Sequence, residues 1–190
     1  NFQLHTAIRI LKPIKHFKAQ SADDVYNEVK KIDWSNIGFG YVQTDERYVA
    51  NFKDGAWDEG GLTKDANITM NECACVLQYA QTVFEGMKAY TTAGGQTVCF
   101  RPDMNAQRMM DSCQRMRMPV FPKERFLDAI RQTVKANIAW VPPYGSGASL
   151  YLRPYMFGID PVLGVKPAHE FQFRVFGTPV GPYFKGGVRP

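Results

Sequence analysis

The hydrophobic periodicity of this chain changes between its middle and its last third, and that change limits the folds open to it. Apolar side chains follow helical spacing over residues 102–117 and again over 123–138, where an aromatic or aliphatic residue recurs at every fourth position. Residues 149–153 and 171–175 instead alternate in period two, as strands do. Helices and strands do not follow a repeated strand–helix–strand order. We therefore expect an α+β fold, with a largely antiparallel sheet packed against helices.

The first third of the chain predicts shorter elements. Ser21 and Asp24 precede apolar residues at helical spacing, which favours a short capped helix. Residues 39–52 are rich in β-branched and aromatic side chains and predict a strand or hairpin. The pair 54–55 (Asp-Gly) indicates a turn after that segment, and the polar, glycine-rich residues 58–71 indicate a loop.

Three further patterns lie between residue 75 and residue 118. Apolar positions at helical spacing predict a helix over residues 75–84, which Gly86 is expected to end. Residues 88–90 and 98–100 flank a glycine-containing segment and predict a hairpin. The methionine-rich residues 109–118 are expected to fill the core rather than to line a ligand groove.

Composition argues against several classes of function. Hydrophobic residues make up 45% of the 190 residues and charged residues 22%, as in globular domains. The net charge is +5, but lysine and arginine are spread along the chain, so we expect no nucleic-acid partner. No segment has the apolar length of a membrane span and no signal peptide is visible, so we expect no membrane partner.

The cysteines and histidines do not form the pattern of a metal site. None of the four cysteines is spaced C-x-x-C, and the three histidines are scattered, so no metal is expected. Buried free thiols in a reducing compartment are the simpler interpretation, and we expect a cytoplasmic protein.

Three groups of residues are candidates for chemistry. Period two places Tyr151 and Arg153 on one face of a strand, where a hydroxyl and a planar guanidinium form a carboxylate site; an edge arginine at the surface is the alternative. Arg101 lies at the start of a helix, a position suited to a phosphate, or else pairs with Asp103 at the helix cap. The aromatic segment 79–90 either lines an apolar pocket or belongs to the core.

Several longer segments, taken in order, resemble the branched-chain aminotransferase family. They are residues 83–90 (VFEGMKAY), 99–105 (CFRPDMN), 149–154 (SLYLRP), 163–165 (LGV) and 179–184 (PVGPYF). The resemblance runs from about residue 39 to the end of the chain, and several spaced matches in one order are more specific than any single motif.

The resemblance implies a pyridoxal-phosphate enzyme that moves the amino group of leucine, isoleucine or valine to 2-oxoglutarate in branched-chain amino acid biosynthesis. It implies that residues 1–183 form the small N-terminal domain of a two-domain fold and that residues 184–190 begin the linker. Its partners would be small amino acids and 2-oxo acids, and the enzyme would be a homodimer.

The resemblance also assigns roles to individual residues. Arg101 would bind the cofactor phosphate. Tyr79, Tyr151 and Arg153 would admit apolar side chains and also accept the distal carboxylate of glutamate. The aromatic wall of the substrate pocket would consist of Phe39, Phe84 and Tyr183, and a loop with Leu163 and Val165 would reach into the site of the neighbouring subunit.

In this family the Schiff-base lysine belongs to the C-terminal domain and is expected beyond Pro190. The resemblance therefore implies that this chain carries no catalytic residue and is inactive alone. Two other interpretations stay open. One is a stand-alone domain that dimerises or binds a small anion, although its exposed cofactor face would be a large apolar patch. The other is a related D-amino-acid transaminase or aminodeoxychorismate lyase, which lacks the pairing of Tyr151 with Arg153 in this form.

Overall fold

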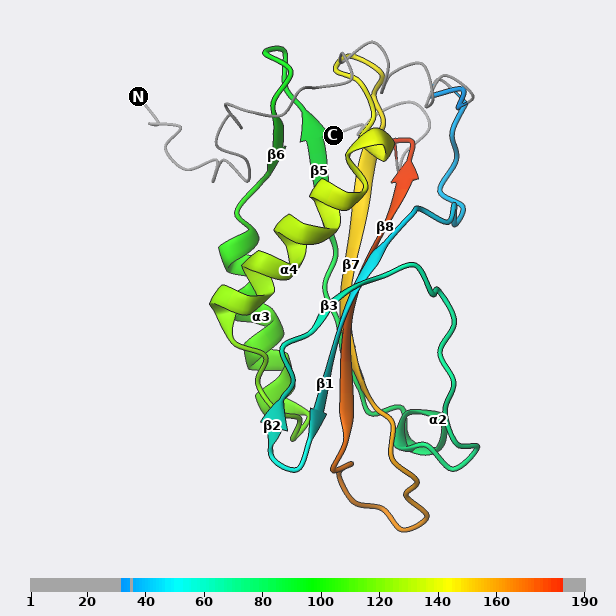
Figure 1. Cartoon of the computed structure of the whole chain (residues 1–190), viewed down its shortest axis with the longest axis vertical. Helices are drawn as coiled ribbons and strands as arrows, with labels where there is room; N and C mark the ends of the chain where they lie inside the picture. The colour runs from blue at the N-terminus through cyan, green and yellow to red at the C-terminus, as the bar shows by residue number, and fades with distance from the viewer. Residues whose placement is uncertain (1–31, 35, 183–190) are drawn as a thin grey trace, which may run out of the picture.

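The computed structural model describes residues 32–34 and 36–182, within which eight strands form one sheet (Figure 1). The main strand order is β2-β1-β8-β7-β5-β6, with β3 also paired to β1 and β4 to β7. Each of these pairings is antiparallel. The strands are β1 (Arg47–Lys53), β2 (Ala56–Trp57), β3 (Gly61–Thr63), β4 (Thr82–Phe84), β5 (Met87–Thr91), β6 (Thr97–Cys99), β7 (Ser149–Gly158) and β8 (Phe171–Val180).

Strands β7 and β8 form the centre of the sheet and pair along their whole length. On β7, Leu150, Leu152 and Met156 are fully buried in the core, whereas Tyr151 and Arg153 between them are only half-buried. This alternation is the period of two that a strand imposes on its side chains. One face of the sheet therefore packs into the core, and the other face is half-buried and carries Tyr151 and Arg153.

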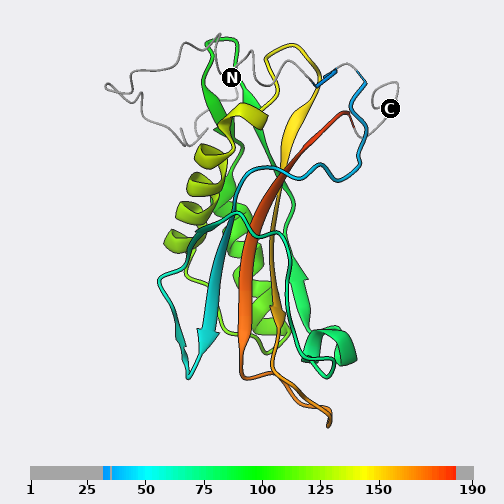
Figure 2. The same ribbon diagram turned by 45° about the vertical axis from the view of Figure 1, so that its right-hand side comes forward.

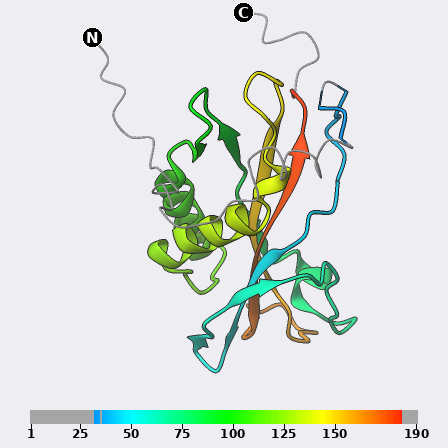
Figure 3. The same cartoon turned by 45° about the horizontal axis from the view of Figure 1, so that its top comes forward.

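Two long helices cover the core face of the sheet (Figures 1 and 2). On α3 the buried residues Ala106, Met109 and Cys113 recur every three or four positions, so one stripe of the helix faces inward. The short helix α2 lies across the strands from both long helices (Figure 3). The helices are α2 (Cys75–Tyr79), α3 (Pro102–Arg115) and α4 (Lys123–Ala136), followed by the short 3-10 helix η1 (Ile138–Trp140).

Aromatic packing fixes α4 and the segment before it on β8. The ring of Phe173, fully buried on β8, stacks on Phe121 with 4.0 Å between ring centroids. Phe126 of α4 lies 5.9 Å from the same ring, and Tyr48 of β1 packs against it edge-on at 6.3 Å. Large rings contribute much buried apolar area, so this cluster holds the helix layer against the sheet.

The predicted fold class is confirmed, since a curled antiparallel sheet with few helices is an α+β architecture. Both long helices, the β5–β6 hairpin and the strands expected at residues 149–153 and 171–175 are also confirmed. The two strands are longer than predicted, ten residues each. The methionine-rich segment is only partly core, because Met109 and Met118 are buried but Met116 is exposed.

The helix predicted over residues 75–84 is wrong in its second half. Helix α2 ends at Tyr79, because Ala80 adopts a left-handed conformation with φ of 52°. The residues after it form β4, and the Thr82 hydroxyl donates to the carbonyl of Met156 at 2.8 Å. Pairing with the edge of β7 therefore overrides the helical spacing.

The first predicted strand and loop also need correction. The strand begins at Arg47 rather than at residue 39, and the predicted turn at 54–55 is present, with positive φ at both positions. The segment 58–71 is not entirely loop, because β3 within it pairs with β1. The predicted helix near Ser21 lies outside the described residues, and the domain boundary after residue 183 stays a prediction.

Candidate functional site

The half-buried face of β7 carries a cluster around Arg153. The Arg153 Nε donates to the hydroxyl of Tyr151 at 3.1 Å. Its guanidinium carbon lies 4.6 Å from the ring centroid of Phe84 and 5.3 Å from that of Tyr151. We call Phe84, Tyr151 and Arg153 the Arg153 cluster. The predicted positions of Tyr151 and Arg153 on one face are confirmed, and Phe84 joins them because β4 pairs with β7.

A two-residue connection between β4 and β5 lies beside this cluster. Both strands pair with the same edge of β7 in one register, so Glu85 and Gly86 continue along that edge between them. The backbone N–H of Glu85 donates to the carbonyl of Pro154 at 2.8 Å. A Cβ on Gly86 would lie 2.6 Å from the hydroxyl of Tyr151. A glycine is therefore needed for the Tyr151 side chain to lie where it does.

Further aromatic rings surround the Arg153 cluster. Phe39 packs edge-on against Tyr151 with 5.8 Å between centroids, so this predicted wall residue lies beside the cluster. Tyr155 and Phe176 pack edge-on against each other at 5.9 Å, and Tyr41 packs on Phe176 at 5.8 Å. Burial raises the pKa of Tyr155, so its phenol stays protonated at neutral pH.

Sequence reasoning missed these last three rings. Tyr155 continues the odd-numbered face of β7, so the period of two that placed Arg153 already contained the signal. Phe176 lies opposite Arg153 in the register of β7 and β8, which only the sheet pairing reveals. Tyr41 comes from a segment without regular structure and had no comparable signal.

Arg101 occupies the N-terminus of α3 in a left-handed conformation, with φ of 44°. Its Nε and Nη2 donate to the two carboxylate oxygens of Asp103, each at 2.9 Å. The pairing with Asp103 that the sequence left open is therefore present. It raises the pKa of Arg101 and lowers that of Asp103, chiefly through these hydrogen bonds. Among the described residues, Nη1 of Arg101 has no hydrogen-bond partner.

An open cavity of about 650 Å³ lies beside Arg101 and reaches the Arg153 cluster at Tyr151 alone. It carries three cationic side chains, Lys88, Arg101 and Arg108, and within the described part of the chain no carboxylate pairs with Lys88. Tyr151 contributes to the same wall. The other lining residues are Gly86, Met87, Tyr90, Phe100, Met104 and Asn105.

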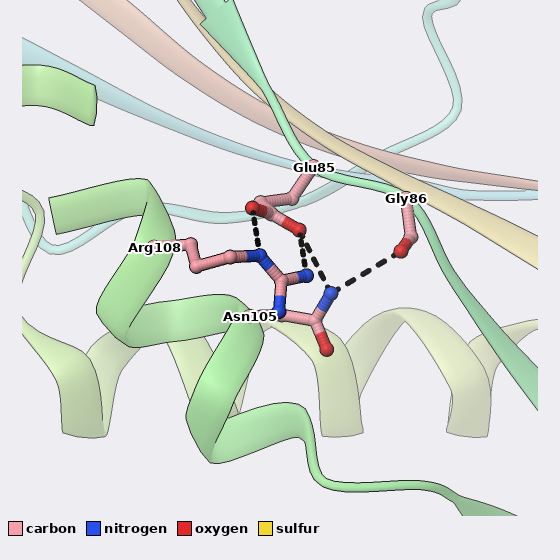
Figure 4. A network of polar contacts seen from close by, with 4 residues as sticks. All are labelled: Glu85, Gly86, Asn105 and Arg108. Atoms are coloured by element: carbon pink, nitrogen blue, oxygen red, sulfur yellow. Dashed lines mark hydrogen bonds and ion pairs between the residues drawn. The ribbon is translucent and has the colours of Figure 1, made fainter. Parts of the chain in front are cut away.

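Besides Asp103, the carboxylate of Glu85 lies close to this cavity in a network of polar contacts (Figure 4). Glu85 accepts hydrogen bonds from Arg108 and Asn105, both on α3. The hydrogen bond to Glu85 is the main reason that the pKa of Arg108 is raised. The network was not predicted, because α3 and the β4–β5 connection are about twenty residues apart in sequence and only the fold brings them together.

The remaining predicted site residues lie elsewhere. The hydroxyl of Tyr79, on α2, donates to the backbone carbonyl of Leu163 in the connection from β7 to β8. Leu163 and Val165 are 85% and 90% exposed. This connection lies at the lower end of the molecule in Figure 1, so Tyr79 does not join Tyr151 and Arg153 within one chain. Tyr183 lies outside the described residues.

The four cysteines are free, three of them buried and Cys73 half-buried. In the described ranges, no group of three or more histidine, cysteine or acidic side chains is arranged to hold a metal ion. No helix within the same ranges has the length and apolar character of a membrane span.

The geometry separates two kinds of binding surface that share Tyr151. The cavity beside Arg101 is cationic and suits a phosphate or another small anion. The Arg153 cluster is apolar and aromatic but includes one guanidinium, so it suits an apolar group or a carboxylate. A ligand with an anion at one end and a variable side chain at the other would contact both.

Comparison with known proteins points to one family. No protein-family model matches the chain. A branched-chain-amino-acid aminotransferase of Haemophilus influenzae is 50% identical over 162 residues, which are 85% of this chain and 47% of that protein. One of Helicobacter pylori is 48% identical over 160 residues, with coverage of 84% and 47%. The chain thus spans about half the length of the relatives that it matches.

Solved structures show the same fold. The branched-chain amino acid aminotransferase of Escherichia coli superposes with a TM-score of 0.59 at 24% identity, covering 75% of this chain and 42% of that one. The enzyme of Thermoproteus uzoniensis, solved with norvaline, gives 0.59 at 22% identity, with coverage of 75% and 43%. Taken with the closer sequence relatives, these likenesses show that the chain belongs to the branched-chain-amino-acid aminotransferase family.

Proposed function

We propose that the complete protein containing this chain is a pyridoxal-phosphate-dependent aminotransferase that moves the amino group of leucine, isoleucine or valine to 2-oxoglutarate in the cytoplasm. The names of the relatives support transamination of branched-chain amino acids. Because the chain spans about half of their length, we propose that the rest of the complete protein supplies the lysine that binds the cofactor, and that residues 1–190 alone do not turn over substrate.

The observation that carries this proposal is the placement of the Arg153 guanidinium against two aromatic rings. An aminotransferase of this kind must accept an aliphatic side chain in one half-reaction and a second carboxylate in the other. Phe84 and Tyr151 offer an apolar surface to the first, and burial of an aliphatic side chain contributes at most a few kcal/mol. The guanidinium of Arg153 offers a planar donor pair to the second.

The residues beside Arg101 fit pyridoxal phosphate. The phosphate would be held by Arg101 through its unpaired Nη1 and by the positive end of α3, with Lys88 adding a second cation. When bound, the cofactor supplies an electron sink for the carbon that loses its proton. The residues of this chain bind and orient: Arg101 holds the phosphate, and the Arg153 cluster holds the substrate side chain away from water.

We propose that the enzyme is a homodimer in which the connection with Leu163 and Val165 enters the site of the other subunit. A second subunit would bury Leu163 and Val165, two aliphatic side chains that are almost fully exposed on one short segment. The hydroxyl of Tyr79 holds the same segment through the carbonyl of Leu163, so the three predicted residues would act together. A twofold symmetric exchange would place one such segment at each site.

The complete protein tests the proposal. Purified with pyridoxal phosphate, it should form glutamate from leucine and 2-oxoglutarate, with a cofactor absorbance band that shifts on addition of leucine. The chain of residues 1–190 tested in parallel should show neither. Turnover of D-alanine but not of leucine would favour the related D-amino-acid transaminases instead. A complete protein that binds phosphate but no cofactor would favour an anion-binding domain.

A further inference from the structure

Glu85 is an acidic residue that is nearly buried, with 11% of its side chain exposed, and it lies between a strand and a helix. Arg108 donates to it through two atoms, Nε to Oε1 at 3.0 Å and Nη2 to Oε2 at 2.7 Å. Asn105 Nδ2 donates to Oε2 at 2.8 Å (Figure 4). The carboxylate thus accepts three hydrogen bonds from two residues one turn apart on α3.

Asn105 also bonds to the backbone next to Glu85. Its Nδ2 lies 3.2 Å from the carbonyl oxygen of Gly86, and Asn105 itself is buried. One amide therefore contacts two consecutive residues of the β4–β5 connection. We call Glu85, Gly86, Asn105 and Arg108 the Glu85 network. The hydrogen bonds of this network are directional, and a guanidinium that donates two of them to one carboxylate tolerates little change in geometry. The network therefore restricts both the shift of α3 along its axis and its rotation about that axis, relative to the β4–β5 connection.

The same connection touches the Arg153 cluster on its other side. Phe84, which precedes Glu85, lies under the guanidinium of Arg153. Gly86, which follows it, lies so close to the hydroxyl of Tyr151 that even a methyl group would collide. Of three consecutive residues, Phe84 thus belongs to the cluster, Glu85 bonds to α3, and Gly86 contacts both. Movement of this connection would change both contacts at once.

Helix α3 carries Arg101 at its first turn. Asn105 lies four residues later, so at the helical rise of 1.5 Å per residue the network is roughly 6 Å along the axis from Arg101. A helix is stiff over such a distance, and the position of Arg101 follows that of Asn105. The network therefore lies between the residue proposed to hold the phosphate and the residues proposed to hold the side chain.

We propose that Glu85, Asn105 and Arg108 are positioning residues that set the distance between Arg101 and the Arg153 cluster. The proposal rests on the proposed function, because it concerns a ligand held at both ends. These residues need not touch the ligand to matter. If α3 moves away from the connection, Arg101 no longer reaches the phosphate while the side chain stays in place, and binding that depends on the phosphate is lost first.

The chain offers a matched control on the neighbouring helix. Asp128 of α4 accepts from Arg131 Nη1 at 3.0 Å and from Gln132 Nε2 at 2.6 Å, an acid with a guanidinium and an amide as at Glu85. The side chains of Asp128 and Arg131 are 51% and 40% exposed and lie on one helix, so this group joins no two elements. An exposed pair of this kind contributes little to stability.

The experiment uses the complete protein freed of cofactor, in which the affinities for pyridoxal phosphate and for pyridoxal are measured by fluorescence quenching. We expect Glu85→Gln to raise the Kd for pyridoxal phosphate at least about 10-fold and that for pyridoxal by less than about 2-fold, since a displacement near 1 Å is enough to weaken a fixed contact. Arg108→Met should behave alike and Arg108→Lys should recover part of the loss. Asp128→Asn should change neither Kd.

The two ligands differ only in the phosphate, so a general loss of folding would weaken both equally and overturn the inference. Equal and unchanged affinities in Glu85→Gln and Arg108→Met would also overturn it, while leaving the proposed function intact if the parent protein binds the cofactor. A parent protein that binds no pyridoxal phosphate would overturn the proposed function and this inference together. A selective loss for the phosphorylated ligand, restored in part by lysine, supports it.

Discussion

The guanidinium of Arg153 lies against the rings of Phe84 and Tyr151 and donates to the Tyr151 hydroxyl, rather than pairing with an acid. Within the described part of the chain no carboxylate lies within ion-pair distance of it. Stacking on Phe84 and Tyr151 orders the guanidinium but leaves its terminal N–H groups available to a ligand. Arg101 differs, because Asp103 already occupies two of its donors. The two arginines are therefore suited to different ligands.

Substitution of Arg153 by methionine should separate the two half-reactions. Arg153→Met keeps an unbranched apolar chain but removes the donors, so we expect kcat/KM for glutamate to fall roughly 10- to 100-fold, as a lost hydrogen bond to a charged group implies. For leucine the change should stay within about 3-fold, because the apolar wall remains. Steady-state kinetics on the complete protein measure both. Arg131→Met on α4 is the matched control, and equal losses for the two substrates would mean that Arg153 only supports the fold.

The buried cysteines should resist alkylation although they are unpaired. Burial disfavours the thiolate and raises the pKa of Cys99 and of Cys113 to about 12. At pH 8 only about one such thiol in ten thousand is ionised, and the thiolate is the reactive form. Iodoacetamide should therefore label Cys73 in the native protein, and peptide mass mapping should find Cys99 and Cys113 labelled only after denaturation. Equal labelling of all of them in the native state would contradict the burial.

At the scale of elements, the β4–β5 connection determines where Tyr151 can lie. Gly86→Ala would place a methyl group 2.6 Å from the Tyr151 hydroxyl, so the ring has to move and its hydrogen bond with Arg153 is lost. We expect the KM for branched-chain substrates to rise about 10-fold, since a small displacement of a binding group weakens binding strongly. The melting temperature should fall by only a few degrees. In Gly94→Ala the new methyl group would lie 3.9 Å from the hydroxyl oxygen of Thr92, an ordinary contact, so neither quantity should change.

The contact between α4 and β8 should dominate the stability of the helix layer. Phe173→Ala removes a fully buried ring that touches Phe121, Phe126 and Tyr48. Such truncations lower the free energy of unfolding by about 3–5 kcal/mol, which urea denaturation measures. Tyr144→Ala, at an exposed ring, should change it by less than about 0.5 kcal/mol. A similar loss in both variants would mean that the layer is not held by this cluster.

Sequence patterns predicted the elements that are long and periodic. They failed where pairing with a neighbouring strand determines the conformation of a short segment. Helices α3 and α4 and strands β7 and β8 each repeat their period several times, so the signal is strong. Strand β4 has three residues and follows a helical pattern, and only the edge of β7 makes it a strand. The same limit applies to the site: Arg153 was predicted from its own strand, whereas Glu85 and Phe176 acquire their roles from residues distant in sequence.

At the scale of the whole molecule, the predicted site residues divide into two groups at opposite parts of the sheet. Arg153 is on β7, whose last residue Gly158 is five residues further along, and Leu163 lies in the connection beyond that end. With about 3.3 Å per residue in a strand, this end of β7 is roughly 16 Å from Arg153. One chain therefore does not bring the two groups together. The proposed homodimer removes this difficulty, because each subunit would supply its connection to the other.

Subunit mixing tests this exchange directly. Leu163→Ser combined with Val165→Ser should reduce turnover in the complete protein without unfolding the subunit, because both side chains are almost fully exposed in the single chain. This double variant keeps Arg153, and Arg153→Met keeps the connection. If the two are mixed and allowed to exchange subunits, roughly half of the dimers are hybrids and one of their two sites has both parts intact, so about a quarter of the parent activity should return. If the connection acts on the site of its own subunit, each site in the hybrid retains one defect and mixing restores nothing. When turnover is limited by the half-reaction with 2-oxoglutarate, which Arg153→Met impairs, the exchange therefore distinguishes a shared site from one that each subunit completes alone.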